Sequence, residues 1–314
     1  MKKLFFLFFL CLIYQLTQAQ TADHLDPEKL LNYYQAQQYA EAAQYLQDTY
    51  TDSTDVSKLK QLAYANLMAG KLPEASGFYL KVLKTDSNNF NAYKQLAKLE
   101  SNLQSPSKKA YLLKANGLNP QDAEVAIQLA DLYFKSNQFN KAEETLNLAL
   151  SADSTNLLLL NAKMPVSMAL KKYPEAIKAG KQLLAATNGP TENLLFQMAL
   201  SYRGARDYKT ATTYLQRAIK EGISPKIASY YGLLGDSYEN LNQNKEALEV
   251  YKKGLLFENN GSLYYNIALL YEDKLNDKKN AIGYYTQYLN SIKDPEKQRR
   301  HVAYIKNKIE ELKR

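Results

Sequence analysis

The side chains best suited to acid–base or nucleophilic chemistry are few and far apart in this chain. The two histidines, His24 and His301, stand near opposite ends of the 314 residues, which argues against a shared metal site or a Ser-His-Asp triad. Acidic pairs such as Glu143-Glu144 sit beside lysine at helical spacing, as solvated charges on helix faces do. The glycines are scattered and form no phosphate-binding loop. We therefore expect no catalytic residues, no metal site and no cofactor.

The composition excludes several other classes of protein. A hydrophobic content of 46% with 23% charged residues suits one or two ordinary cores and rules out a disordered tail. One cysteine cannot build a disulfide scaffold. The absence of tryptophan disfavours a glycan-binding surface, which leans on tryptophan stacking. The net charge of +8 is spread along the chain without a dense run, so we expect no nucleic-acid partner.

The first residues have the pattern of an export signal. Two lysines precede an apolar run over residues 4–16, and small side chains follow up to Ala19. The run is too short for a membrane span, and Cys11 lacks the small preceding residue of a lipoprotein signal. We expect residues 1–19 to be a signal peptide, cleavage after Ala19, and no membrane-spanning segment in the mature chain. The protein is then exported, with the periplasm favoured over full secretion.

A period of about 34 residues runs along the rest of the chain. Its clearest mark is a small residue that, in most copies, follows an aromatic or leucine by three positions and precedes a bulky apolar residue by four. The small residues are Ala42, Ala75, Ala142, Ala176, Ala211, Ala247 and Ala281. From the first to the last are 239 residues, which make seven steps of 34.1 on average because the interval from Ala75 to Ala142 spans two. Such a repeat length is typical of stacked supersecondary units.

A second column of small residues precedes the first. Its members are Ala63, Ala97, Ala130, Ala199, Gly235 and Ala268. Apolar residues recur at spacings of three and four, which indicates helices, and small residues allow two helices to approach closely. Between the helical stretches lie clusters of Asp, Ser and Asn, such as residues 86–89 and 153–156, whose side chains can cap the next helix.

These columns resemble the tetratricopeptide repeat (TPR) family over residues 23–294. The resemblance implies an all-α fold, a right-handed superhelix of about eight helix-turn-helix repeats. The repeats would start near residues 23, 56, 90, 123, 157, 192, 228 and 261. Two repeats depart from the pattern: the third has Lys108 near its alanine column, and the fifth has Met164 and Pro165 where a small residue and a smooth helix are expected. Pro165 is expected to kink or interrupt its helix.

The chain therefore divides into three segments. Residues 1–19 are the signal peptide and residues 20–294 the repeat solenoid. Residues 295–314 form one amphipathic helix, because Val302, Ile305, Ile309 and Leu312 are spaced three, four and three apart. Such a helix would cover the apolar side that a terminal repeat leaves exposed.

The TPR resemblance implies a concave groove lined by the first helix of each repeat. In this register the groove residues are Lys60, Tyr64, Leu67, Lys94, Lys98, Ile127, Asp131, Phe134, Asn161, Phe196, Arg203, Asp236, Glu239 and Tyr265. Exposed aromatic side chains among charges suit an extended peptide or a partner helix. The rings of Tyr64, Phe134 and Phe196 could instead pack across the groove on neighbouring helices, so both readings stay open.

The sequence thus predicts a non-catalytic scaffold or adaptor that binds a peptide or partner protein in the groove. One alternative is a component of a cell-envelope assembly machine, for the outer membrane or surface structures. Another is a glycan-binding helical protein. Residues 20–55 carry seven acids against one base, whereas the rest of the mature chain is basic. This asymmetry could allow head-to-tail self-association through the acidic first repeat, or could simply be a solvated end.

Overall fold

The protein is all-α. The computed structural model describes residues 25–51, 53–102, 105–187, 189–222, 225–258 and 260–314, and the expected signal peptide lies outside these residues. The described part contains seventeen helices and no strand. In chain order they are α2 (Pro27–Gln35), α3 (Tyr39–Thr49), α4 (Val56–Met68), α5 (Leu72–Thr85), α6 (Phe90–Leu99), α7 (Pro106–Leu118), α8 (Ala123–Lys135), α9 (Phe139–Ala152), α10 (Leu157–Ala169), α11 (Tyr173–Ala186), α12 (Glu192–Gly204), α13 (Tyr208–Glu221), α14 (Ile227–Asn240), α15 (Asn244–Leu255), α16 (Gly261–Asp273), α17 (Lys278–Ser291) and α18 (Arg299–Lys313).

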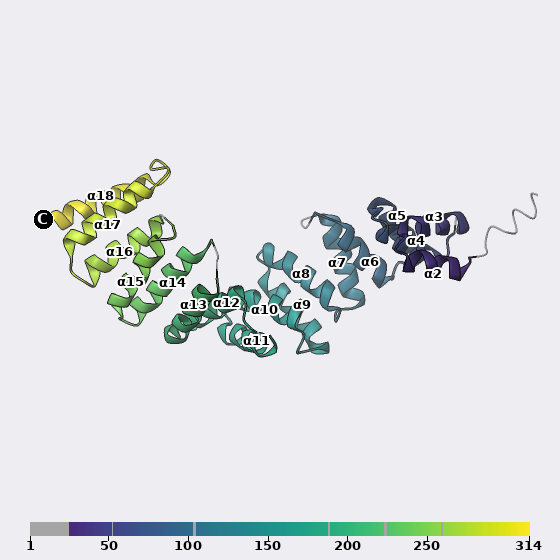
Figure 1. Cartoon of the computed structure of the whole chain (residues 1–314), viewed down its shortest axis with the longest axis horizontal. Coiled ribbons are helices and arrows are strands. Elements are labelled where there is room, and N and C mark those ends of the chain that lie inside the picture. The colour runs from purple at the N-terminus through teal and green to yellow at the C-terminus, as the bar shows by residue number, and fades with distance from the viewer. Residues whose placement is uncertain (1–24, 52, 103–104, 188, 223–224, 259) are drawn as a thin grey trace, which may run out of the picture. The chain divides into compact units, whose positions relative to one another are not determined.

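The helices form consecutive pairs, from α2 with α3 to α16 with α17, and α18 follows the eighth pair (Figure 1). From α2 to α9, and again from α10 to α18, each helix packs mainly on the helices that precede and follow it in the chain. The chain divides into two compact units, residues 1–152 and 153–314. The stacked helix pairs confirm the fold class that the 34-residue period predicts.

Side-chain caps and left-handed turns set the helix boundaries. Most first helices begin after an Asp, Asn or Thr whose side chain accepts a backbone N–H, for example Asp55 for α4 and Asn156 for α10. The turn inside most repeats contains one residue with positive φ. These residues are Gln37, Gly70, Asn137, Lys171, Arg206, Asn242 and Asn276. A tight, uniform turn therefore joins the two helices of these repeats.

The core of each repeat pairs a small residue with a large one. The alanines of the second-helix column, from Ala42 to Ala281, are fully buried. Four residues later come large buried side chains such as Leu146 and Tyr251. In the seventh repeat the Tyr251 ring lies against Gly235 of the first-helix column. These pairs let neighbouring helices approach closely while filling the interior.

The fifth repeat reverses this pairing. Met164 is fully buried in the first-helix column, and Gly180 stands in the second-helix column where the other repeats have a large side chain. A Cβ atom at Gly180 would lie 2.1 Å from Met198 Sδ and 3.0 Å from Met164 Cε. The sulfur side chains thus occupy the space that a leucine or tyrosine fills elsewhere.

Two residues that break the repeat pattern are accommodated without loss of a helix. Pro165 lies inside α10, which continues to Ala169, so the helix is not interrupted there, and the alternative of a kink stays a prediction. Its neighbours Met164 and Val166 are both buried, and their packing holds the helix on either side of the proline. In the third repeat α7 forms with Lys108 in the alanine column, where the buried Lys108 ammonium donates to the Glu100 carbonyl at 3.0 Å.

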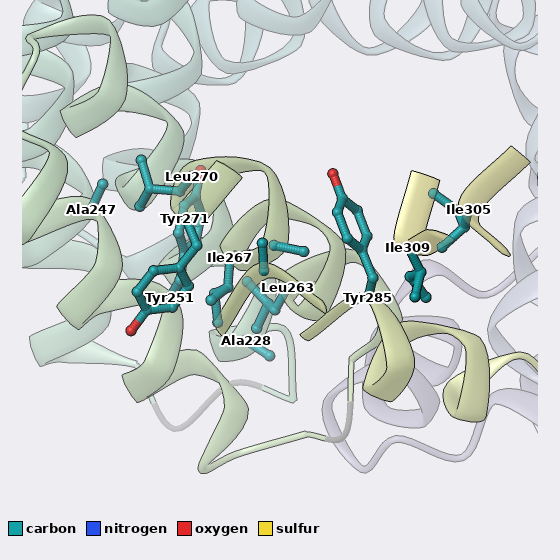
Figure 2. Packing of buried hydrophobic residues seen from close by; sticks show 12 residues of the cluster. Ala228, Ala247, Tyr251, Leu263, Ile267, Leu270, Tyr271, Tyr285, Ile305 and Ile309 are labelled. Atoms are coloured by element: carbon teal, nitrogen blue, oxygen red, sulfur yellow. The ribbon is translucent and has the colours of Figure 1, made fainter. Parts of the chain in front are cut away.

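Helix α18 closes the last repeat. Ile305 and Ile309 are buried against Tyr285 of α17, which also packs toward Ile267 of α16 (Figure 2). On the same helix Lys308 forms an ion pair with Glu272 at 3.1 Å. One face of α18 therefore continues the core, and its other face is polar.

Candidate protein-interaction surface

The first helices of the opening three repeats surround a hollow of about 600 Å³. Its apolar part comes from Leu30, Leu31 and Tyr34 of α2 and from Tyr64 of α4. The Tyr64 ring is 49% exposed and lies 6.0 Å from the Tyr34 ring, centroid to centroid. The groove prediction included Tyr64 but none of the residues of α2, a helix without a buried residue.

Polar groups rim this hollow. The half-buried Lys60 lies one helical turn before Tyr64, and Gln61, Ser57 and Asn91 also line the hollow. Leu67, the third predicted groove residue of α4, is half-buried and lies outside the lining. The site thus offers a bulky apolar contact with one ammonium group and several hydrogen-bonding groups beside it.

Further along the same unit the predicted lysines are tied to the next repeat. Lys94 Nζ lies 2.8 Å from Asp122 and 3.0 Å from Glu124, and Lys98 Nζ lies 2.6 Å from Glu124. Burial by itself would lower the pKa of Lys94, but the hydrogen bonds to the two carboxylates outweigh burial and the pKa is raised. Burial would raise the pKa of Asp122, yet the bond from Lys94 and the backbone bonds lower it. These charges connect α6 to the start of α8.

The predicted residues of α8 contact their own repeat. Ile127 is half-buried, and Asp131 accepts a hydrogen bond from Lys135 at 2.6 Å. The Phe134 ring meets the Phe139 ring edge to face, with centroids 5.2 Å apart. Phe134 thus packs on the first residue of α9, within its own repeat, and its place in a groove stays a prediction.

In the second unit Asn161 is exposed on α10, and the other predicted residues meet neighbouring helices. The Phe196 ring stacks on the Tyr230 ring, with centroids 4.4 Å apart, so this ring also packs across the helices. Arg203 forms an ion pair with Asp236, and its Nε donates to Ser237 Oγ at 3.1 Å. The Arg203–Asp236 pair lies at one side of a second hollow, of about 450 Å³, that α12, α14 and α16 line mostly with polar side chains such as Ser229 and Asn266.

Two predicted groove residues serve the interior of the second unit. Glu239 accepts a hydrogen bond at 2.5 Å from the hydroxyl of the buried Tyr251. Burial raises the pKa of Glu239, and the Tyr251 bond opposes that rise. The Tyr265 ring lies 6.1 Å from the Tyr285 ring and 5.6 Å from the His301 ring of α18. Both side chains therefore have partners inside the unit that the register alone could not reveal.

The described residues contain no group of three or more His, Cys, Asp or Glu that could hold a metal ion. Within the same residues no helix combines the length and the apolar character that crossing a bilayer requires.

Several solved structures are similar to this chain. YrrB, whose structure is described as a TPR protein with an unusual peptide-binding site, is 21% identical, and the match covers 57% of this chain and 91% of YrrB with a TM-score of 0.47. A tetratricopeptide repeat protein from Parabacteroides merdae is 17% identical, over 77% of this chain and 96% of that protein, with a TM-score of 0.49. MamA is 22% identical, over 52% and 93%, with a TM-score of 0.47. No curated protein matches the chain.

Three family models described as tetratricopeptide repeat match the sequence, over residues 109–163, 196–262 and 261–294. The last match spans one complete helix pair, α16 with α17, and has the length of the sequence period. Family and fold therefore agree, and the chain belongs to the tetratricopeptide repeat family.

Proposed function

We propose that this protein is a non-catalytic scaffold that binds a peptide or a partner protein on the surface of its first helices. The observation that carries the proposal is the hollow at α2, α4 and α6, where Tyr64 is half exposed above an apolar wall. A large ring in water forgoes burial worth about 1.5–3 kcal/mol, which a bound apolar side chain would recover. Lys60, at the rim, adds a positive charge for a carboxylate of the ligand.

The polar hollow of the second unit is a further contact surface for an extended segment. Its hydroxyl and amide groups, from Ser229, Ser262 and Asn266, can bond a peptide backbone, and the Arg203–Asp236 pair presents both signs of charge. Since Arg203 and Asp236 already form an ion pair, a charged group of the ligand must compete with one of them for the other.

Selection of ligands from a displayed random-peptide library tests the proposal. We expect selected peptides to bind the purified chain and to lose at least about tenfold in affinity with Tyr64→Ser or Lys60→Glu, equivalent to about 1.4 kcal/mol. The matched control is Leu80→Ser, which removes a side chain of similar exposure (42%) from the second helix α5. Peptides that bind Tyr64→Ser normally but lose affinity with Leu80→Ser would place the interaction on the second helices. A library that yields no ligand at either hollow would contradict the proposal.

The proposal includes export of the protein, for which the pattern of residues 1–19 is the support. Amino-terminal sequencing of the protein recovered from a periplasmic fraction should begin at Gln20. Recovery from the cytoplasm with Met1 intact would contradict this part alone.

A further inference from the structure

Helix α3 carries an acidic stripe on its exposed face. Glu41, Tyr45 and Asp48 are spaced four and three residues apart, so they share one face, opposite the buried Ala42 and Leu46. Glu41 and Asp48 are exposed, and no ion pair among the described residues involves either carboxylate.

The aromatic residue in the middle of this stripe is held in place. Lys29 Nζ lies 4.6 Å from the centre of the Tyr45 ring, and the Asp26 N–H donates to the Tyr45 hydroxyl at 2.8 Å. The ring therefore needs little further ordering before it contacts a partner.

Helix α18 carries a basic stripe of the same spacing. Arg299, Ala303 and Lys306 are also four and three residues apart and are all exposed, while Ile305 faces the core. In the described part of the chain Arg299 and Lys306 take part in no ion pair, whereas Lys308 on the buried side is paired with Glu272.

The two stripes match in charge and in length. Each pair of charges is seven residues apart, or about 10.5 Å along a helix. In an antiparallel arrangement Glu41 meets Lys306 and Asp48 meets Arg299, and the Tyr45 ring lies over the small Ala303. We propose that the α3 stripe of one copy binds the α18 stripe of a second copy. Because the two surfaces differ, each bound copy leaves one stripe open, and further copies can add head to tail.

Sedimentation velocity of the purified chain, as 314 residues and as residues 20–314, tests the proposal over a range of concentrations. We expect reversible assembly at 25 mM NaCl that weakens on the order of tenfold at 500 mM NaCl, because salt screens exposed charges. The variants Glu41→Lys/Asp48→Lys and Arg299→Glu/Lys306→Glu should each stay monomeric, since both stripes of one variant then have the same sign. An equimolar mixture of the two variants should assemble again.

Matched controls separate these stripes from net charge. Glu246→Lys/Glu249→Lys and Lys209→Glu/Lys245→Glu change the same number of exposed charges on α13 and α15, and both should assemble as the unaltered chain does. Circular dichroism checks that every variant stays helical. A chain that is monomeric at low salt up to high concentration overturns the proposal. So does a mixture of the two stripe variants that fails to assemble. Neither result bears on peptide binding at Tyr64.

Discussion

In two repeats a glycine lies opposite a large buried side chain in the core. In the seventh repeat the buried Tyr251 stands where three other repeats have leucine, and the facing residue is Gly235 instead of alanine. In the fifth repeat the large residue is Met164 and the small one is Gly180. In both repeats a glycine thus leaves room for the large side chain that faces it, as close packing requires.

Gly235→Ala should therefore destabilise the second unit. The new Cβ atom would lie 2.3 Å from Tyr251 Cε1, and the buried ring cannot move away without disturbing the core. We expect a loss of about 1–3 kcal/mol in the free energy of unfolding, measured by urea denaturation. The control is Gly283→Ala at an exposed position of α17, where a Cβ meets nothing within 4 Å. Helix propensity predicts a gain of about 0.5–1 kcal/mol there. Equal effects of the two substitutions would contradict the packing argument.

Lys94→Met should destabilise the first unit in a pH-dependent way. At pH 7 it leaves the Asp122 carboxylate without its nearest cation and removes one of the two cations beside Glu124, which costs about 1–2 kcal/mol after allowance for solvent. The pKa of each of these carboxyls is lowered in the folded chain, so their contribution to stability is present above the ordinary pKa and is lost as the pH falls through the lowered one. The difference from the unaltered chain should shrink below about pH 4.

Urea denaturation from pH 7 to pH 3 measures this effect. Lys98→Met is the control, because the Lys98–Glu124 pair is about 40% exposed on each side and should contribute less than about 0.5 kcal/mol. A Lys94→Met loss that is constant with pH would show that its alkyl packing, and not its charge, is what matters.

The sequence predicts the small-residue columns well, because one alanine per period is visible without a structure. It does not show the Met164–Gly180 exchange, because the two residues compensate each other across sixteen positions and each alone looks like a departure. The partners of Glu239 and Phe196 were missed for a related reason. The repeat pattern assigns a residue to one face of its own helix, but it does not show which side chains of other helices reach that face. Here the Tyr251 hydroxyl bonds Glu239, and the Tyr230 ring stacks on Phe196.

At the scale of helices, capping residues and apolar spacing were sufficient to predict the helix pairs. The position of a proline predicted the end of a helix less well. The clash and lost hydrogen bond at Pro165 are local costs, whereas Met164, Val166 and Ser167 are buried around it and tertiary packing keeps α10 continuous. The positive-φ residues Lys171 and Arg206 could not be predicted as turn centres, because neither residue type favours that conformation.

Helix α18 should contribute strongly to the stability of the last repeat. Ile305→Ala removes a fully buried side chain from the contact with Tyr285 and should cost about 2–5 kcal/mol in the free energy of unfolding. Asn307→Ala, on the exposed side of the same helix, should stay within about 0.5 kcal/mol of the unaltered chain. If the two substitutions have similar effects by urea denaturation, α18 does not act as a cap.

At the scale of the whole molecule, each unit has a core of its own. The first contains the clusters around Leu46, Tyr79 and Leu129, and the second those around Leu215 and Tyr285. Expressed separately, residues 20–152 and 153–314 should each be helical by circular dichroism and melt cooperatively. A fragment that is unfolded by itself would show that its stability depends on the other.

Since each helix packs chiefly on its sequence neighbours within its unit, almost every stabilising contact joins residues less than two repeats apart. Such a chain has a low contact order, so little loop-closure entropy opposes its folding. Structure can begin at any repeat and grow outward, one helix at a time. The same locality means that a 34-residue segment can be gained or lost between two matching turns without redesign of the remaining core. The length of the array is therefore open to evolution in whole-repeat steps.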